Sequence, residues 1–121
     1  MTTLTFRVPW AALCSDNRKY VALGVLSPQY RASKDVIALL AKFAAKKQKW
    51  KEALGPLRMA VCITEPDHRK RDHLNFAKGM CDALTQGGVW SDDSQVRDAH
   101  WYFSADVDKT NAGATITIEV L

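Results

Sequence analysis

The 121-residue sequence has few of the features that mark secreted, zinc-finger or membrane proteins. Its three cysteines, Cys14, Cys62 and Cys81, are odd in number and form neither a CxxC pair nor a metal-finger spacing. We therefore expect three reduced thiols, not a disulfide framework or a zinc site. No segment approaches the roughly 18 consecutive apolar residues of a membrane span, and the N-terminus lacks the apolar region of a signal peptide. We expect a cytoplasmic protein with no membrane partner.

Internal repeats and low-complexity segments are also absent, and no serine-nucleophile arrangement is recognisable, because Ser91 and Ser94 have no His or Asp partner in such a pattern. The composition of 47% hydrophobic and 25% charged residues is typical of globular proteins and argues against disorder. A chain of this length suits one domain, which we expect to span residues 1–121.

Positive charge is concentrated in two segments. The formal net charge is +4, and residues 31–52 hold seven Lys or Arg against two acids. Lys46 and Lys47 belong to this first segment, and Arg69, Lys70 and Arg71 form the second. A lysine run on a helix is more often a solvated face than a phosphate-binding surface. For the first segment, which includes Lys46 and Lys47, both interpretations stay open. For the second we favour phosphate contact, because carboxylates adjoin it.

Hydrophobic spacing predicts an α+β fold of the order β-α-β-α-β-β, with two main helices packed on a small mixed sheet. We expect strands at residues 4–8, 57–64, 96–103 and 114–120, and a further short strand near residues 20–23. The strand at 57–64 has apolar residues on both alternations, which indicates an interior strand packed on both faces. We expect the last two strands to form a hairpin joined by residues 106–113.

The first helix is expected to begin at a cap supplied by Ser27, before Pro28, or by Ser33, and to end at Gly55-Pro56. Its predicted core positions are Val36, Leu40, Phe43 and Ala44. The second helix is expected to begin within residues 72–75 and to end at the Gly87-Gly88 pair, because Phe76, Met80 and Leu84 recur at helical spacing.

Residues 66–98 place an acidic centre inside a basic patch. Arg69, Lys70 and Arg71 run into Asp72, Lys78 follows, and Asp92-Asp93 returns after the second helix. A phosphodiester nuclease needs both ingredients, because cations hold the polyanionic backbone and carboxylates hold the divalent metal that polarises the scissile phosphate.

Each of these residues also has an ordinary structural interpretation. Asp72 could cap the following helix, Asp92-Asp93 could belong to a turn, and Lys78 with Asp82 could form a surface pair one helical turn apart. Trp90 and Trp101 are better explained as core or dimer-interface residues than as platforms for bases.

The same segment resembles a known family. The order of a basic cluster, Asp72, Asn75, Lys78, Asp82-Ala83-Leu84, Gly88, Trp90 and Asp92-Asp93-x-Gln95-Val96 resembles the RusA family of Holliday junction resolvases, small phage and prophage enzymes of bacterial host cells. Val8-Pro9-Trp10, Asn17 and Tyr20 resemble the family's opening segment, and residues 115–118 its last strand. The family's usual core is Asp-x-Asp-Asn-x-x-Lys, so Leu74 stands where a second acid is expected.

This resemblance implies a homodimeric, Mg²⁺-dependent endodeoxyribonuclease that acts on four-way junctions in DNA recombination and repair, with Mn²⁺ as a substitute. It implies catalytic roles for Asp72, Lys78 and Asp93 and metal binding by Asp72 and Asp93. Asp92, and less readily His73, are candidates to replace the missing ligand. The alternative is a junction-binding protein that Leu74 has left weakened or inactive. Cleavage preference, metal count and dimer geometry stay open.

Overall fold

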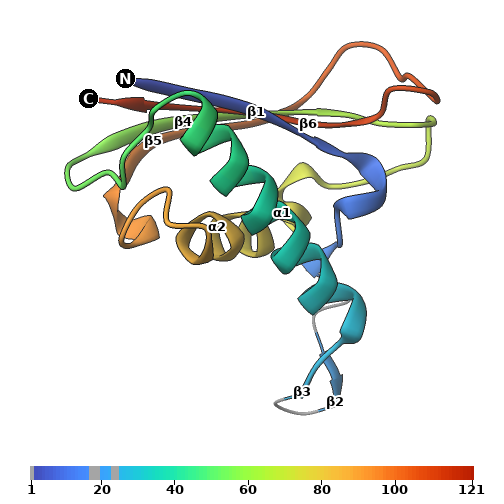
Figure 1. Ribbon diagram of the computed structural model, residues 1–121. Coiled ribbons are helices and arrows are strands. Elements are labelled where there is room, and N and C mark those ends of the chain that lie inside the picture. Colours follow the sequence, from blue (N-terminus) through green and yellow to red (C-terminus); the bar gives the residue numbers. More distant parts are fainter. Residues whose placement is uncertain (1, 17–19, 23–24) are drawn as a thin grey trace.

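The computed structural model describes residues 2–16, 20–22 and 25–121 of the chain. Its main body is a four-stranded sheet of order β1-β6-β4-β5, made of β1 (Thr3–Pro9), β4 (Leu57–Thr64), β5 (Val96–Phe103) and β6 (Gly113–Val120). Two helices, α1 (Pro28–Lys47) and α2 (Ala77–Gln86), lie on one face of this sheet (Figure 1). The predicted α+β class, with a small mixed sheet and two main helices, is confirmed.

Shorter elements connect these in the described part of the chain. The 3₁₀ turns described there include η1 (Trp10–Ala12), η3 (His73–Phe76) and η4 (Asp93–Gln95), and β2 (Tyr20–Ala22) pairs antiparallel with β3 (Val25–Leu26). This small hairpin projects away from the main sheet (Figure 1). Along the chain it lies between the N-terminal segment and α1. The short strand expected near residues 20–23 corresponds to β2, while Leu23 and the family-like Asn17 lie outside the described residues.

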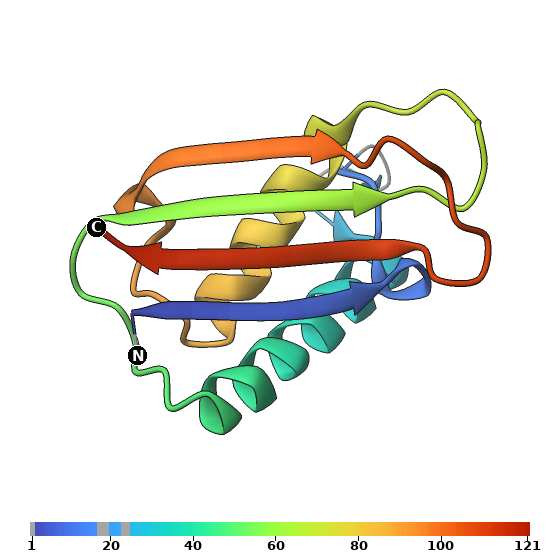
Figure 2. The same cartoon turned by 90° about the horizontal axis from the view of Figure 1, so that it is seen from above.

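The strand order corrects one prediction. β5 and β6 do not form the expected hairpin, because β4 lies between them, parallel to β5 and antiparallel to β6 (Figure 2). β6 also pairs antiparallel with β1. The connection from Phe103 to Gly113 is far longer than the two to five residues of a usual hairpin loop, so it can cross the end of β4. The parallel β4–β5 pair needs a crossover, which α2 supplies.

The interior position predicted for β4 is confirmed, but the prediction that this strand is packed on both faces is wrong. Leu57, Met59, Val61 and Ile63 are buried, whereas the alternate residue Arg58 is exposed and the others are only partly buried. The reason is that α1 and α2 cover the same face of the sheet (Figure 1). The core therefore forms a single layer between this face and the two helices.

Helix α1 begins as predicted and ends earlier than predicted. The Ser27 side chain accepts a hydrogen bond of 3.1 Å from the Tyr30 N–H, and Pro28 occupies the first turn. The helix ends at Lys47 and not at Gly55-Pro56, because the side chain of Gln48 binds both backbone groups of Thr5 in β1. Lys49 then adopts a positive φ of 58°, which turns the chain away from the helix.

The core face of α1 is also rotated from the predicted one. Leu40 and Ala44 are partly buried and pack on the core, but Val36 is 43% and Phe43 63% exposed. The fully buried positions of this helix form a different set, Tyr30, Ile37, Ala38 and Ala41. Small residues let the two helices approach closely, since a Cβ added at Gly87 would lie 2.9 Å from the Ala38 carbonyl oxygen.

Helix α2 follows η3 and ends at the predicted glycine pair, with Gly87 as its C-cap. Trp90, just beyond this helix, is fully buried in the core. A core position was one of the two predicted for this residue, the other being a dimer interface. None of the helices in the described part of the chain combines the length and the apolar character that crossing a bilayer requires.

Candidate active site and nucleic-acid interface

The predicted catalytic lysine lies between two carboxylates. Lys78 Nζ is 3.2 Å from Asp82 Oδ1 and 3.8 Å from Asp93 Oδ2. Lys78 and Asp82 are one turn apart on α2, whereas Asp93 comes from η4, beyond the end of that helix. The hydrogen bond to Asp82, followed by the charges of Asp82 and Asp93, raises the pKa of Lys78 above its ordinary value. Lys78 is therefore held as a cation beside Asp93 at neutral pH.

Two further residues fix the position of this lysine. The Asp16 carboxylate accepts hydrogen bonds of 3.1 Å and 3.0 Å from the N–H groups of Lys78 and Gly79 in the first turn of α2. A carboxylate at this end of a helix is stabilised by the free N–H groups and by the helix dipole. The Tyr30 hydroxyl donates a 3.4 Å hydrogen bond to Asp82 Oδ2. Burial, and then the charge of Asp82, raises the pKa of Tyr30, so the hydroxyl keeps its proton.

The sequence did not single out Asp16 or Tyr30. They are 62 and 52 residues from their partners on α2, and no spacing rule connects positions so far apart. Asp82 was identified, but only as a motif position and as half of a surface pair. Its second contact with Tyr30 could not be inferred from helical spacing.

Asp72 caps the short helix η3. Its Oδ1 accepts a 2.9 Å hydrogen bond from the Leu74 N–H, and its backbone carbonyl accepts one from the Asn75 N–H. The capping function considered for Asp72 is thus present in the structure. Its side chain is nevertheless exposed, so an oxygen can still face a bound ligand. The capping contact does not test the predicted catalytic role.

Asp92 and Asp93 begin η4 in a capping box. The Asp92 side chain accepts from the Ser94 N–H at 3.1 Å, while Gln95 Oε1 accepts from the Asp92 N–H at 3.0 Å. The Ser94 hydrogen bond, and then one with Asp93, lowers the pKa of Asp92, which keeps this carboxylate ionised. The turn chemistry considered for this pair is therefore present, and the Asp93 carboxylate of this turn lies beside Lys78.

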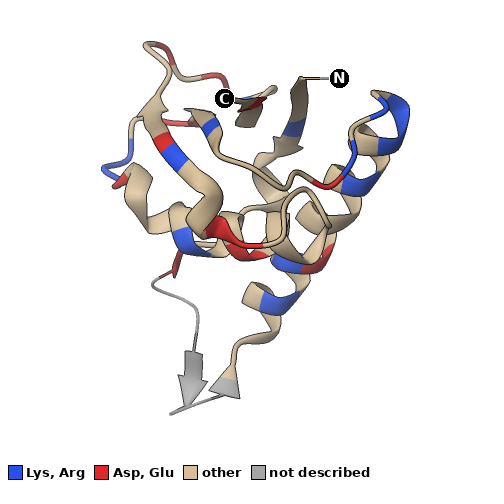
Figure 3. Ribbon diagram, turned by 90° about the vertical axis from the view of Figure 1, so that its left-hand side faces the viewer, with Lys and Arg blue, Asp and Glu red and all other residues tan. Residues whose placement is uncertain are grey.

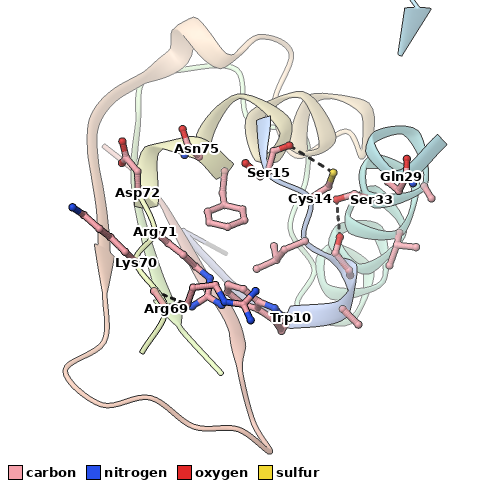
Figure 4. Close-up of a pocket in the computed structure, with 16 residues that line it drawn as sticks. Trp10, Cys14, Ser15, Gln29, Ser33, Arg69, Lys70, Arg71, Asp72 and Asn75 are labelled. Atoms are coloured by element: carbon pink, nitrogen blue, oxygen red, sulfur yellow. Dashed lines mark hydrogen bonds between the residues drawn. The ribbon is translucent and has the colours of Figure 1, made fainter. Parts of the chain in front are cut away.

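The predicted site residues fall into two neighbouring hollows. The first has a volume of about 640 Å³, and Arg69, Lys70, Arg71, Asp72 and Asn75 contribute to its lining (Figure 4). The second has a volume of about 520 Å³. It is lined by Lys34, Lys78, Asp82, Thr85, Gln86, Ser91, Asp92 and Asp93. The structure thus groups Lys78 with Asp92 and Asp93, and it places Asp72 in the lining of the other hollow.

These residues partly fit a divalent metal. Asp72, Asp92 and Asp93 offer only carboxylate oxygens, the ligands that Mg²⁺ prefers, and Mg²⁺ often takes just one or two protein carboxylates. Within residues 2–16, 20–22 and 25–121, however, no group of three His, Cys, Asp or Glu side chains is placed to hold a metal ion. At position 74 the side chain of Leu74 is 56% exposed and offers no ligand.

The three basic residues before Asp72 have different environments. Arg69 and Lys70 are exposed. The Arg71 guanidinium instead lies 3.0 Å from Glu65 Oε2 and 2.8 Å from Asp67 Oδ1, and it stacks 4.8 Å from the centre of the Trp10 ring. Only 15% of the Arg71 side chain is exposed. The DNA contact predicted for Arg71 is untested, but these contacts give the residue a structural function.

Lys46 and Lys47 lie at the opposite end of α1 from the first hollow. That hollow is lined by residues of the N-terminal half of the helix, up to Val36, and Lys46 is about 15 Å further along at 1.5 Å per residue. Lys46 and Lys47 belong to the last turn of α1, and Figure 3 shows the basic, blue end of this helix apart from the other basic segments of the ribbon. The two basic segments are therefore separate features of the surface.

Comparison with known proteins agrees with the resemblance noted in the sequence. Residues 9–119 match the family described as endodeoxyribonuclease RusA. The chain is 33% identical over 104 residues to the crossover junction endodeoxyribonuclease RusA of Escherichia coli K12, which covers 81% of this chain and 80% of that protein. The Shigella sonnei protein of the same name is 32% identical over the same length. A protein of that name from Enterobacteria phage 82 is 44% identical over 43 residues, 36% of each chain. The chain therefore belongs to the RusA family.

Proposed function

We propose that this protein is a structure-selective endonuclease that hydrolyses phosphodiester bonds in four-way DNA junctions during recombination and repair. The observation that carries the proposal is the position of Lys78 beside Asp93, within a chain that matches the family along nearly its whole length. The names of the relatives, crossover junction endodeoxyribonucleases, support the choice of substrate. Relatives from bacteria and a phage also support a protein that works in the cytoplasm of a bacterial host.

Lys78 has the central role among the chain's own groups. Its ammonium group stabilises the negative charge that develops on the scissile phosphate. This contribution is large when the positive group is already held in position before the reaction. Asp82 and Asp16 hold the lysine in position, one through the ammonium group and the other through the start of α2. Arg69 and Lys70 bring the DNA backbone toward the site.

Mg²⁺, or Mn²⁺ in its place, would be held by one or two of the carboxylates Asp72, Asp92 and Asp93, because the described residues do not group all three. Such a metal would supply Lewis-acid polarisation of the scissile phosphate and activation of the attacking water. The Ser94 hydrogen bond lowers the pKa of Asp92, so this carboxylate can face a cation without first losing a proton. Substrate phosphate oxygens would complete the ligand set, so metal affinity is expected to be higher when DNA is present.

A homodimer suits this substrate. Resolution of a four-way junction requires cuts in two symmetry-related strands, and two identical active sites related by a dyad match that symmetry. Analytical ultracentrifugation with and without junction DNA tests this part of the proposal, and a monomer in both conditions would contradict it.

Leu74 supports a second candidate function, a junction-binding protein with weak or no nuclease activity. An exposed apolar side chain occupies the position at which the family pattern has an acid. Restoring the carboxylate in Leu74→Asp raises cleavage strongly if the chain is a weakened nuclease. Leu74→Asn is the matched control, because it is polar and of similar size but offers no charge.

Cleavage of labelled four-way junctions tests the main proposal. Immobile and mobile junctions are incubated with the wild-type protein in Mg²⁺, in Mn²⁺ and in EDTA, and the products are separated on a denaturing gel. We expect paired cuts with either metal and none in EDTA. We also expect binding to weaken as salt rises, since phosphate contacts release counterions. Binding without cleavage in both metals would favour the second candidate.

A further inference from the structure

The first hollow has the size of a ligand site, and apart from Arg69, Lys70 and Asp72 its lining takes no part in the proposed chemistry. It lies between the segment after β1, the first half of α1, and the loop that leads into η3 (Figure 4). Its volume of about 640 Å³ falls within the usual range of pockets for small organic groups. Asp72 and Asn75 stand at one side, so the hollow adjoins the predicted catalytic segment.

The lining combines apolar surface with uncommitted amides. Leu13, Trp10 and Phe76 supply the apolar part, and Phe76 is itself buried in the core. Gln29 on α1 and Asn75 in η3 face the hollow from different sides (Figure 4). Neither side-chain amide forms a hydrogen bond with another residue that the structure describes. Each amide offers both donors and an acceptor.

The rim of the hollow is positively charged and held in place. Arg69 and Lys70 are exposed there. Arg71 fixes the loop that carries them, through Glu65, Asp67 and the Trp10 ring. A rim that is already ordered loses little conformational freedom when it binds a ligand. Arg69 and Lys70 therefore offer phosphate groups a contact at the mouth, while apolar side chains line part of the interior.

We propose that this hollow receives one unpaired nucleobase of the DNA strand whose phosphates contact Arg69 and Lys70. A base has a flat apolar body and a polar edge, which match the apolar wall and the two amides. A base at a branch point is already poorly stacked, so moving it into a pocket costs less than from a continuous duplex. The inference rests on the proposed function, since it assumes branched DNA as substrate.

Abasic scanning of a four-way junction tests the inference. Binding is measured in EDTA, so that cleavage plays no part, on junctions in which each nucleotide near the crossover is replaced in turn by an abasic residue. Ala32→Phe fills the hollow from the exposed surface of α1, and Leu39→Phe adds a ring to the same helix outside the hollow. Gln29→Ala removes one amide without filling the hollow.

For the wild type we expect one abasic position to weaken binding by roughly tenfold or more. Ala32→Phe should bind the intact junction with that reduced affinity, and the abasic residue should not weaken its binding further. The affinity of Gln29→Ala for the intact junction should lie between those of the wild type and Ala32→Phe. Leu39→Phe should match the wild type. A wild type that binds the intact junction but shows a flat scan overturns the inference and leaves the proposed function standing. Equal sensitivity in Ala32→Phe also overturns it. A wild type that binds no junction refutes the proposed function, and the inference with it.

Discussion

Arg71→Met is the substitution for which the structure predicts a stability effect that the sequence alone would not. The sequence places Arg71 in a basic run with Lys70, as one more phosphate-contacting cation. The structure instead gives it Glu65, Asp67 and the Trp10 ring as partners. Methionine keeps an unbranched apolar stem but leaves Glu65, whose side chain is only 15% exposed, without its cation.

The expected loss is about 2 kcal/mol of unfolding free energy. Breaking a fully buried ion pair costs about 3–5 kcal/mol, and an exposed pair is worth about 0–1 kcal/mol. The Arg71–Glu65 pair is mostly shielded on both sides, so its value lies between these limits, whereas Asp67 is 47% exposed and adds little. The contact with the Trp10 face adds about 0.5–1 kcal/mol.

Urea denaturation followed by tryptophan fluorescence measures this loss. Lys70→Met is the matched control, because its side chain is exposed and its substitution should stay within about 0.5 kcal/mol of the wild type. The double variant Glu65→Gln with Arg71→Met should recover part of the loss, since no unpaired carboxylate is left. The reasoning is refuted if Arg71→Met is no less stable than Lys70→Met.

Three further predictions concern other parts of the molecule. Asp82→Asn should lower the cleavage rate and move the alkaline limb of the pH–rate profile to lower pH, because Asp82 raises the pKa of Lys78. Asp35→Asn is the control. An unchanged profile in Asp82→Asn would count against a positioning role for Asp82. Gly113→Ala should cost at least about 2 kcal/mol in thermal unfolding, since its φ is 155° and an added Cβ would collide with the Val8 carbonyl oxygen; wild-type stability would contradict this. In a variant whose other cysteines are serine, Cys81 should react with iodoacetamide at pH 8 at least about tenfold more slowly than free cysteine, because burial raises its pKa to about 12.

Much of the fold was predictable because local signals carry it. The alternation of Leu4, Phe6 and Val8 and the Ser27 cap each depend on residues that are close in sequence. The pairing of strands was not predictable in the same way. β4 could be placed between β5 and β6 only through hydrogen bonds between segments some 40 to 60 residues apart, and no local pattern records them.

The candidate site shows the same division. Asp72, Lys78 and the Asp92-Asp93 pair were found because they follow the order of a known family. Asp16 and Tyr30 were missed because they act on Lys78 from distant loops and helices. Arg71 lines the first hollow together with Asp72, but its ion pair with Glu65 and its contact with the Trp10 ring could not be inferred from spacing. Sequence order therefore predicted the candidate residues, and packing shows which side chains hold Lys78 in place.

The central claim is that the Lys78 and Asp93 pair cuts branched DNA. The most direct test compares single-turnover cleavage of a four-way junction by the wild type and by Asp93→Asn, in Mg²⁺, with binding of each protein to the same junction measured in EDTA. We predict that Asp93→Asn binds the junction as the wild type does but does not cleave it. Cleavage by Asp93→Asn at the wild-type rate would contradict the account.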